Sequence, residues 1–184
     1  LLAQQQTARV EELRAGKYQN ILESNPALKL IKGYATFKDA NTLTISNANG
    51  LEQELHADKI LISTGSTPTI PPIQGLESTP YWTSTEALFA ECLPKHLVVI
   101  GSSVVALEIA QAYRRLGSEV TVIARHTLLY REDPLLGEKL TECFEKEGIH
   151  VLKNTEANHV LHDGELFQIE TNKGSLSSDQ LLIS

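Results

Sequence analysis

Apolar residues recur along this chain with two different spacings, and the spacing changes near residue 25. Before that point Val10, Leu13 and Ile21 recur at near-helical intervals among polar and charged residues. Pro26 follows and is typical of a helix end, because proline cannot continue a helix. The pattern therefore predicts a helix from residue 1 to about residue 24.

Short segments rich in β-forming residues come next. The segments LKLIKGYATF, NTLTIS and LEQELH follow one another within residues 28–56, and the turn-forming NANG separates the second from the third. They predict a small antiparallel β-meander. Residues 59–63 are more apolar and predict a further strand, of the kind held in a sheet that is covered on both faces.

Prolines and glycines concentrate within residues 64–80, which is the expected domain boundary. Beyond it strands and helices alternate: HLVVI, a helix over residues 103–116, EVTVIA, a helix over residues 134–147, and IHVLKN as a third parallel strand. A hairpin around Asp163-Gly164 and a last buried strand complete the pattern.

This order of elements predicts the α/β fold class, with a Rossmann-like domain built on a parallel sheet and, before it, a β-meander and an N-terminal helix. We expect one domain over residues 1–66, a linker over residues 67–80 and a second domain over residues 81–184.

Individual residues delimit and orient the two later helices. Asp133 can cap the second one, with Pro134 at its first position and Gly148 in a left-handed conformation after its end. In the first helix the apolar residues expected to face the core are Val105, Ile109 and Leu116.

Composition narrows the class of protein. The 184 residues carry a net charge of −7 and no cluster of Lys and Arg, which argues against nucleic-acid binding. No apolar run approaches the roughly 20 residues that cross a bilayer, so no membrane association is expected. The absence of methionine suggests a fragment of a longer chain.

The two cysteines, Cys92 and Cys143, match no disulfide framework and no metal-ligand spacing. We expect both to be buried thiols, no metal site, and a reducing, cytoplasmic location.

The segment VVIGSSVVALE, residues 98–108, lies where a strand should turn into a helix over a nucleotide. The dinucleotide fingerprint GxGxxG asks for three glycines, and Gly101 keeps only the first. Ser103 stands in the second place and Ala106 in the third, where one methyl group is tolerated. The hydroxyls of Ser102 and Ser103 can donate to phosphate beside the free amides of the helix start.

The candidate pyrophosphate turn therefore comprises Gly101, Ser102, Ser103, Val104, Val105 and Ala106. A doubly wound domain whose site is empty or different is the alternative.

Basic residues follow the next strand, where an NAD-binding domain usually has a carboxylate for the ribose hydroxyls. Arg125, His126 and Arg131 lie in the same predicted loop and favour the 2′-phosphate of NADPH. The alternative is a solvated basic loop whose charge balances Glu132 and Asp133.

Several longer segments resemble one known family. YWTSTEAL and VVIGSSVVALEIAQAYRRLGSEVTVIARHTLLYRED, together with GKYQNIL, GYATF and ISTGSTPTIPPIQG, resemble the pyridine nucleotide-disulfide oxidoreductase flavoproteins, and among them the mercuric reductases. The segment GSSVVALE is characteristic of that branch, and the likeness runs through nearly the whole chain. The spacing of the three basic residues is similar to that of the 2′-phosphate clamp of glutathione reductase.

The resemblance implies an enzyme in which NADPH gives a hydride to FAD, the flavin reduces a cysteine pair, and the thiolates bind Hg(II) and reduce it to Hg(0). It places Glu108 near the flavin and the nicotinamide, paired with a lysine of the FAD domain. It places Thr64 and Gly65 near the flavin, and Tyr34 and Ala35 near the adenine of FAD.

By the same resemblance residues 1–66 are part of an FAD-binding domain and residues 81–184 are a truncated NADPH-binding domain. The redox CxxxxC, the first FAD-binding GxGxxG and a C-terminal dimerisation domain are absent from these residues. We therefore expect an incomplete FAD site, a fragment that is inactive alone, and a parent protein that forms a homodimer.

Two alternatives compete with this interpretation. The region can belong to a sister enzyme, such as a glutathione reductase-like or dihydrolipoamide dehydrogenase-like disulfide reductase. It can also be a non-enzymatic module that senses NADPH or presents an interaction surface.

Overall fold

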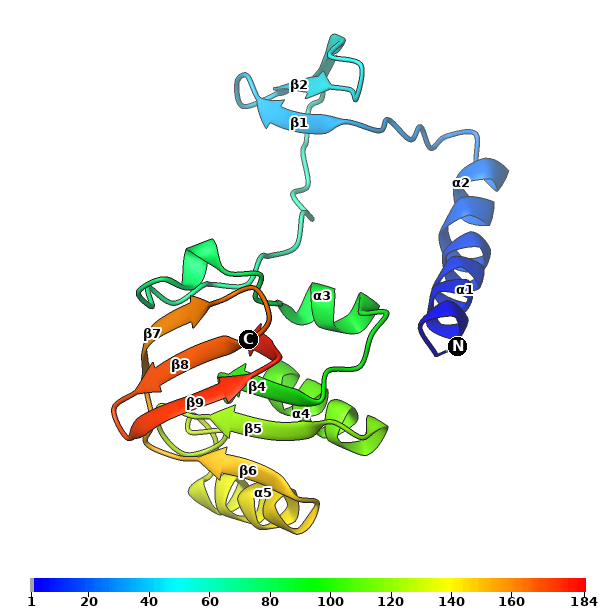
Figure 1. The fold of residues 1–184 in the computed structure, drawn as a ribbon. Helices are drawn as coiled ribbons and strands as arrows, with labels where there is room; N and C mark the ends of the chain where they lie inside the picture. Colours follow the sequence, from blue (N-terminus) through cyan, green and yellow to red (C-terminus); the bar gives the residue numbers. More distant parts are fainter. Residues whose placement is uncertain (1) are drawn as a thin grey trace. The chain divides into compact units, whose positions relative to one another are not determined.

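The structure is a computed structural model that describes residues 2–184. The chain forms two compact units, of which one ends at Ser66 and the other spans Thr67–Ser184. Figure 1 labels most of their helices and strands. Within residues 2–184, no helix has the length and apolar character needed to cross a membrane.

The first unit opens with the predicted helix. It consists of α1 (Leu2–Arg14), one turn of π-helix η1 (Ala15–Gln19) and α2 (Asn20–Ser24) in direct succession. The backbone becomes extended at Asn25, whose side-chain Oδ1 accepts a hydrogen bond from the amide of Ala27 at 3.0 Å. The predicted helix over the first 24 residues is thus confirmed for its described part.

The predicted β-meander follows as β1 (Tyr34–Phe37), β2 (Thr42–Ser46) and β3 (Glu52–His56), paired antiparallel in that order. Asn47 closes the turn between β2 and β3, because its Oδ1 accepts hydrogen bonds at 3.0 Å from the amides of Asn49 and Leu51.

The strand predicted over residues 59–63 is wrong, because these residues form no strand. A strand needs a neighbour that accepts and donates its backbone hydrogen bonds. No described residue pairs with this segment, and the side chains of Leu61 and Ile62 are 90% and 66% exposed. The segment has the apolar composition of a strand, but composition does not reveal whether a partner strand lies beside it.

The second unit is built on a parallel sheet with the strand order β10-β4-β5-β6. These strands are β4 (His96–Ile100), β5 (Glu119–Ile123), β6 (Ile149–Leu152) and β10 (Gln180–Ile183). The predicted parallel arrangement is confirmed. The predicted last buried strand is β10, which pairs with β4 and forms one edge of the sheet.

Three layers form this unit. The helices α3 (Ser84–Phe89), α4 (Val104–Leu116) and α5 (Pro134–Lys146) cover one face of the parallel sheet, and an antiparallel sheet of β7 (Ala157–His162), β8 (Phe167–Thr171) and β9 (Gly174–Ser178) covers the other (Figure 1). Alternate residues of β4 serve the two faces: Leu97 and Val99 pack under the helices, whereas Val98 packs under the antiparallel sheet. Each such fully buried side chain contributes about 1.5–3 kcal/mol to stability.

Two expectations about buried side chains were wrong. Ile109 is buried as predicted, but Val105 and Leu116 are 46% and 48% exposed, because they lie at the flank of the helix face centred on Ala106 and Ala110. The two cysteines are exposed rather than buried. On α5 the neighbouring Thr141 and Phe144 take the buried side instead of Cys143.

The caps predicted for α5 are confirmed. Asp133 Oδ1 accepts a hydrogen bond from the amide of Leu135 at 2.9 Å, and Gly148 adopts a φ of +78°. Gly117 likewise ends α4 in a left-handed conformation.

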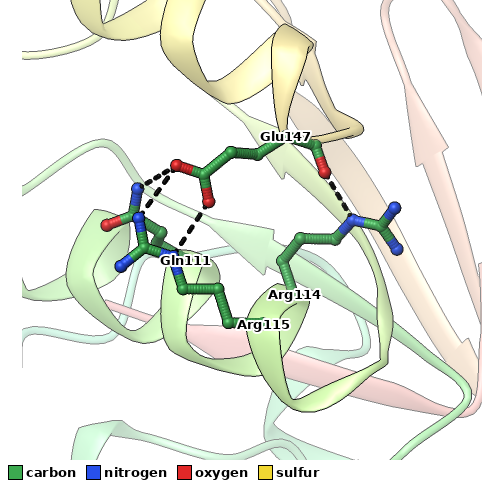
Figure 2. Close-up of polar contacts among 4 residues, drawn as sticks. All are labelled: Gln111, Arg114, Arg115 and Glu147. Atoms are coloured by element: carbon green, nitrogen blue, oxygen red, sulfur yellow. Dashed lines mark hydrogen bonds and ion pairs between the residues drawn. The ribbon is translucent and has the colours of Figure 1, made fainter.

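The C-terminal ends of α4 and α5 are tied together through Glu147 (Figure 2). Arg115 donates from Nε and Nη2 to the two carboxylate oxygens of Glu147 at 3.0 and 2.9 Å, and Gln111 donates to Oε1 at 2.8 Å. Arg114 donates from Nε to the backbone oxygen of Glu147 at 2.7 Å. The hydrogen bonds from Arg115 hold the pKa of the Glu147 carboxyl below its ordinary value. The network holds α4 and α5 together at the ends remote from the first turn of α4.

Candidate functional site

A cleft of about 570 Å³ lies at the carboxyl ends of the parallel strands of the second unit. Its walls come from residues that follow β4, β5, β6 and β10, and from residues 69–73 of the segment that precedes the sheet. In open α/β sheets this edge is where ligands bind, because the loops after the strands converge there.

The turn after β4 requires glycine for a reason that lies in the neighbouring strand. Gly101 has a φ of +136°, and a Cβ atom at this position would lie 1.7 Å from the backbone oxygen of Ser184. Both residues are fixed by hydrogen bonds across the sheet, since Gly101 donates to Ile123 at 3.0 Å and Ser184 donates to Ile100 at 3.1 Å. No side chain fits at residue 101 without displacing backbone.

Ser103 caps the helix that follows. Its Oγ accepts a hydrogen bond from the amide of Ala106 at 3.1 Å, so its hydroxyl proton stays available for another acceptor. The amides of Val104 and Val105 have no hydrogen-bond partner within residues 2–184. The first turn of α4 therefore offers free N–H donors and the positive end of the helix dipole to an anion.

The loop after β5 is held in a defined shape. Leu128 of this loop is fully buried. Its carbonyl oxygen lies so close to Gly137 of α5 that a Cβ atom at residue 137 would lie 2.3 Å from it. Leu129 adopts a left-handed conformation with φ +49°, and the amide of Glu132 donates to its carbonyl at 2.8 Å. A non-glycine residue in this conformation is held there by its surroundings.

This loop brings the three predicted basic residues into the cleft. Arg125, His126 and Arg131 all line it, together with Gly101, Ser102, Ser103 and Val104 of the turn. Arg125 Nε lies 3.2 Å from Glu156 Oε1. Arg131 donates from Nε to the hydroxyl of Tyr130 at 2.9 Å and makes no ion pair with any residue that the structure describes.

The other predicted site residues lie elsewhere. Ala106 is fully buried on the inner face of α4, and Val105 is exposed outside the cleft. Glu108 is exposed and lines a separate small cavity of about 130 Å³ between α4 and α5. The four residues expected to contact FAD belong to the first unit, where Tyr34 and Ala35 lie on the exposed strand β1 and Thr64 and Gly65 lie outside any helix or strand.

Several cleft residues were missed by the sequence analysis. Tyr130 lies within the basic loop, and Glu156 follows β6. A signal for Glu156 existed, because the third parallel strand must end at the same sheet edge as the first two. Thr69, Pro71 and Ile73 carried no signal, since only the course of the chain brings them to the cleft.

Comparisons with known proteins agree on one family. The family described as pyridine nucleotide-disulphide oxidoreductase matches residues 2–184. The chain is 76% identical over its full length to a mercuric reductase of Shewanella putrefaciens and 53% identical over its full length to one of Shigella flexneri. It spans about a third of the length of these relatives, 33% in each case.

Among solved structures, the HOCl-induced flavoprotein disulfide reductase RclA of Escherichia coli is similar, with a TM-score of 0.92 and 29% identity over 99% of this chain and 41% of that one. LpdA of Mycobacterium tuberculosis is also similar, with a TM-score of 0.81 and 28% identity over 100% of this chain and 42% of that one.

Proposed function

The chain belongs to the pyridine nucleotide-disulphide oxidoreductase family, and on that premise we propose that residues 81–184 bind NADPH for a flavin-dependent reductase of Hg(II). One observation carries the nucleotide part of the proposal. Arg125, His126 and Arg131 gather in a single cleft with the open first turn of α4.

The cleft fits a dinucleotide in size and in chemistry. Its volume of about 570 Å³ lies within the range of roughly 300–1,000 Å³ that is usual for ligand pockets. The free amide of Val104 and the hydroxyls of Ser102 and Ser103 suit the pyrophosphate. The serine in place of the second glycine caps α4 and keeps a donor at the turn, so its presence is compatible with phosphate binding.

The basic residues suit a 2′-phosphate. Charge-assisted hydrogen bonds contribute about 1.5–3 kcal/mol each, and less where the side chains are exposed. No carboxylate follows β5 directly, because the chain continues from Ala124 into Arg125 and His126. The loop therefore attracts the group that distinguishes NADPH from NADH, and no carboxylate stands directly after β5, where an NAD-binding domain usually has one.

When bound, NADPH supplies two electrons as a hydride. The residues of this chain contribute binding and orientation: the first turn of α4 holds the pyrophosphate and the loop after β5 holds the 2′-phosphate. We propose that Glu108 lies near the nicotinamide and the flavin in the intact protein. Its exposed carboxylate makes no ion pair within residues 2–184, so it is free to meet a lysine from another domain.

We propose FAD as the second cofactor of the intact protein, with Tyr34, Ala35, Thr64 and Gly65 as contacts. The cleft and the small cavity both lie within residues 69–184, whereas the four residues proposed to contact FAD belong to the first unit and are exposed. We derive no step through the flavin for that reason.

Mercury as the substrate is supported by the relatives, which are named mercuric reductase. The balanced reaction is Hg(II) plus NADPH giving Hg(0), NADP⁺ and a proton. We do not assign this chemistry to the two exposed thiols, because Cys92 lies in the segment between α3 and β4 whereas Cys143 lies on α5. As in the sequence analysis, we propose that the intact protein is a homodimer.

The test is NADPH oxidation by the intact, FAD-loaded protein in the presence of excess thiol, with Hg(II) or oxidised glutathione as the acceptor. We expect Hg(II) to drive oxidation and to leave as mercury vapour, with little oxidation by the disulfide. Oxidation driven by the disulfide alone would favour a sister disulfide reductase. Nucleotide binding without any oxidation would favour a sensing module.

A further inference from the structure

We propose that Tyr130 is a positioning residue that holds His126 and Arg131 in the geometry required for the 2′-phosphate. This inference rests on the proposed NADPH site and deepens it. Tyr130 stands outside the three basic residues that the spacing alone identified, yet it contacts two of them and lines the same cleft.

The first contact fixes Arg131. Its Nε donates a hydrogen bond to the Tyr130 hydroxyl at 2.9 Å, and its Cζ lies 5.4 Å from the centroid of the Tyr130 ring. The bond uses Nε only, so both terminal nitrogens of the guanidinium stay available to a phosphate. A cation within about 6 Å of an aromatic ring is attracted to its face.

The second contact fixes His126. The imidazole and the Tyr130 ring have centroids 4.8 Å apart, with their planes tilted by 50°. This distance lies within the range in which aromatic pairs attract each other. Tyr130 therefore touches both side chains, and the three residues form one continuous cluster.

The backbone shows that the placement of Tyr130 is built into the loop. Leu129, which precedes it, is held at φ +49°, while Leu128 is anchored in the core. The amide of Asn154 also donates to the carbonyl of His126 at 3.1 Å, which fixes the other end of the cluster. Leu129 also packs against the hydrophobic core, so its left-handed backbone sets a fixed course for the chain into the half-exposed Tyr130.

The contacts with Tyr130 reduce the conformational entropy that Arg131 loses when it binds a phosphate. A solvent-exposed arginine samples many rotamers and loses this freedom when it binds a phosphate. Because Tyr130 already restricts Arg131 in the free protein, Arg131 loses less conformational entropy when it binds a phosphate. The affinity therefore rises only for a nucleotide that carries the 2′-phosphate. Immobilising one such side chain changes a dissociation constant by about twofold to tenfold.

The experiment compares NADP⁺ and NAD⁺ binding to the intact protein by calorimetry, with Tyr130→Leu and Tyr130→Phe as variants. Tyr130→Leu removes the ring and the hydroxyl, whereas Tyr130→Phe keeps the ring and removes only the hydrogen bond to Arg131. Tyr18→Leu is the matched control, because Tyr18 is also exposed, at 64%, and lies in the first unit.

We expect Tyr130→Leu to weaken NADP⁺ binding by about twofold to tenfold with NAD⁺ binding unchanged, and Tyr130→Phe to have a smaller effect of the same kind. The thermal midpoint of each variant should stay close to that of the unsubstituted protein. Equal weakening of both nucleotides, or full retention of the NADP⁺ preference in Tyr130→Leu, overturns the inference and leaves the proposed function intact. If the unsubstituted protein does not prefer NADP⁺, the proposed NADPH site fails, and the role of Tyr130 fails with it.

Discussion

The Nε atom of Arg125 lies 3.2 Å from Oε1 of Glu156, and both side chains line the same cleft. The arginine that best suits a 2′-phosphate is therefore already paired with a carboxylate. Glu156 and an incoming phosphate carry charge of the same sign, so the carboxylate competes with the ligand for Arg125. Both side chains are at least half exposed, which keeps this competition weak.

Glu156→Gln is expected to strengthen NADPH binding by about twofold to fivefold, because it removes a competing charge worth less than about 1 kcal/mol. NADH binding should change little. The measurement is the dissociation constant of each nucleotide at low ionic strength, with Glu170→Gln as the control, since Glu170 pairs with His159 and does not line the cleft. Weaker NADPH binding in Glu156→Gln would mean that Glu156 orients Arg125 instead of competing for it.

Gly101→Ala is expected to destabilise the second unit by more than the roughly 1–2 kcal/mol that a left-handed alanine costs, because the methyl group would also meet the carbonyl of Ser184. Gly164→Ala is the matched control, since Gly164 also has a positive φ, of +107°, but nothing lies within 4 Å of its Cβ position. Denaturant unfolding compares the two. Equal losses of stability would show that Ser184 imposes no constraint on the turn.

Glu147→Gln is expected to lower stability at neutral pH and to reduce the loss of stability in acid. Hydrogen bonds from Arg115 depress the pKa of Glu147 below the ordinary value of 4.5, so the native state favours the charged carboxylate. Such a group stabilises the fold above the unfolded-state pKa, and this contribution disappears as the pH falls through the lower folded-state pKa.

The measurement is the free energy of unfolding as a function of pH. The difference between the unsubstituted protein and Glu147→Gln should be present at neutral pH and should shrink as the pH drops below 4.5. Glu145→Gln, a neighbouring change on α5 that removes no ion pair described within residues 2–184, should show neither effect. A pH-independent difference would mean that the charge of Glu147 contributes nothing.

Glu108→Gln is expected to leave the dissociation constant of NADPH nearly unchanged, because Glu108 lies outside the cleft. In the intact protein it should slow flavin reduction by about tenfold to a hundredfold, the kinetic equivalent of one charge-assisted hydrogen bond. Rapid mixing with NADPH measures the rate, and Glu138→Gln on the exposed side of α5 serves as the control. An unchanged rate of flavin reduction would show that Glu108 is only a charged residue on the surface of α4.

The parallel sheet could be predicted because its signals are local. Apolar strands such as HLVVI, the capping residue Asp133 and the glycine that follows α5 each dictate their own conformation. Both faces of β4 are covered, with Leu97 and Val99 on one face and Val98 on the other, so the strand is apolar at every one of these positions.

The parts that could not be predicted depend on partners distant in the sequence. Residues 59–63 have strand composition but no neighbouring strand within the described chain. Leu116 follows the apolar helical period, yet it lies outside the buried face of α4 and is 48% exposed. Glu156 is signalled only by the end of the third strand, and the fold brings it to Arg125. Tyr130 lies beside Arg131 in the sequence, but only the conformation of the loop places its ring against His126.

The central claim is that the loop after β5 selects NADPH, and the most direct measurement is the dissociation constant of NADPH and of NADH for Arg125→Ala. The matched control is Arg9→Ala, which removes an equally exposed arginine from the first unit. We expect Arg125→Ala to weaken NADPH binding by about tenfold, after allowance for the exposure of the side chain, and to leave NADH binding nearly unchanged. An equal loss for both nucleotides, or no loss for either, would contradict the account.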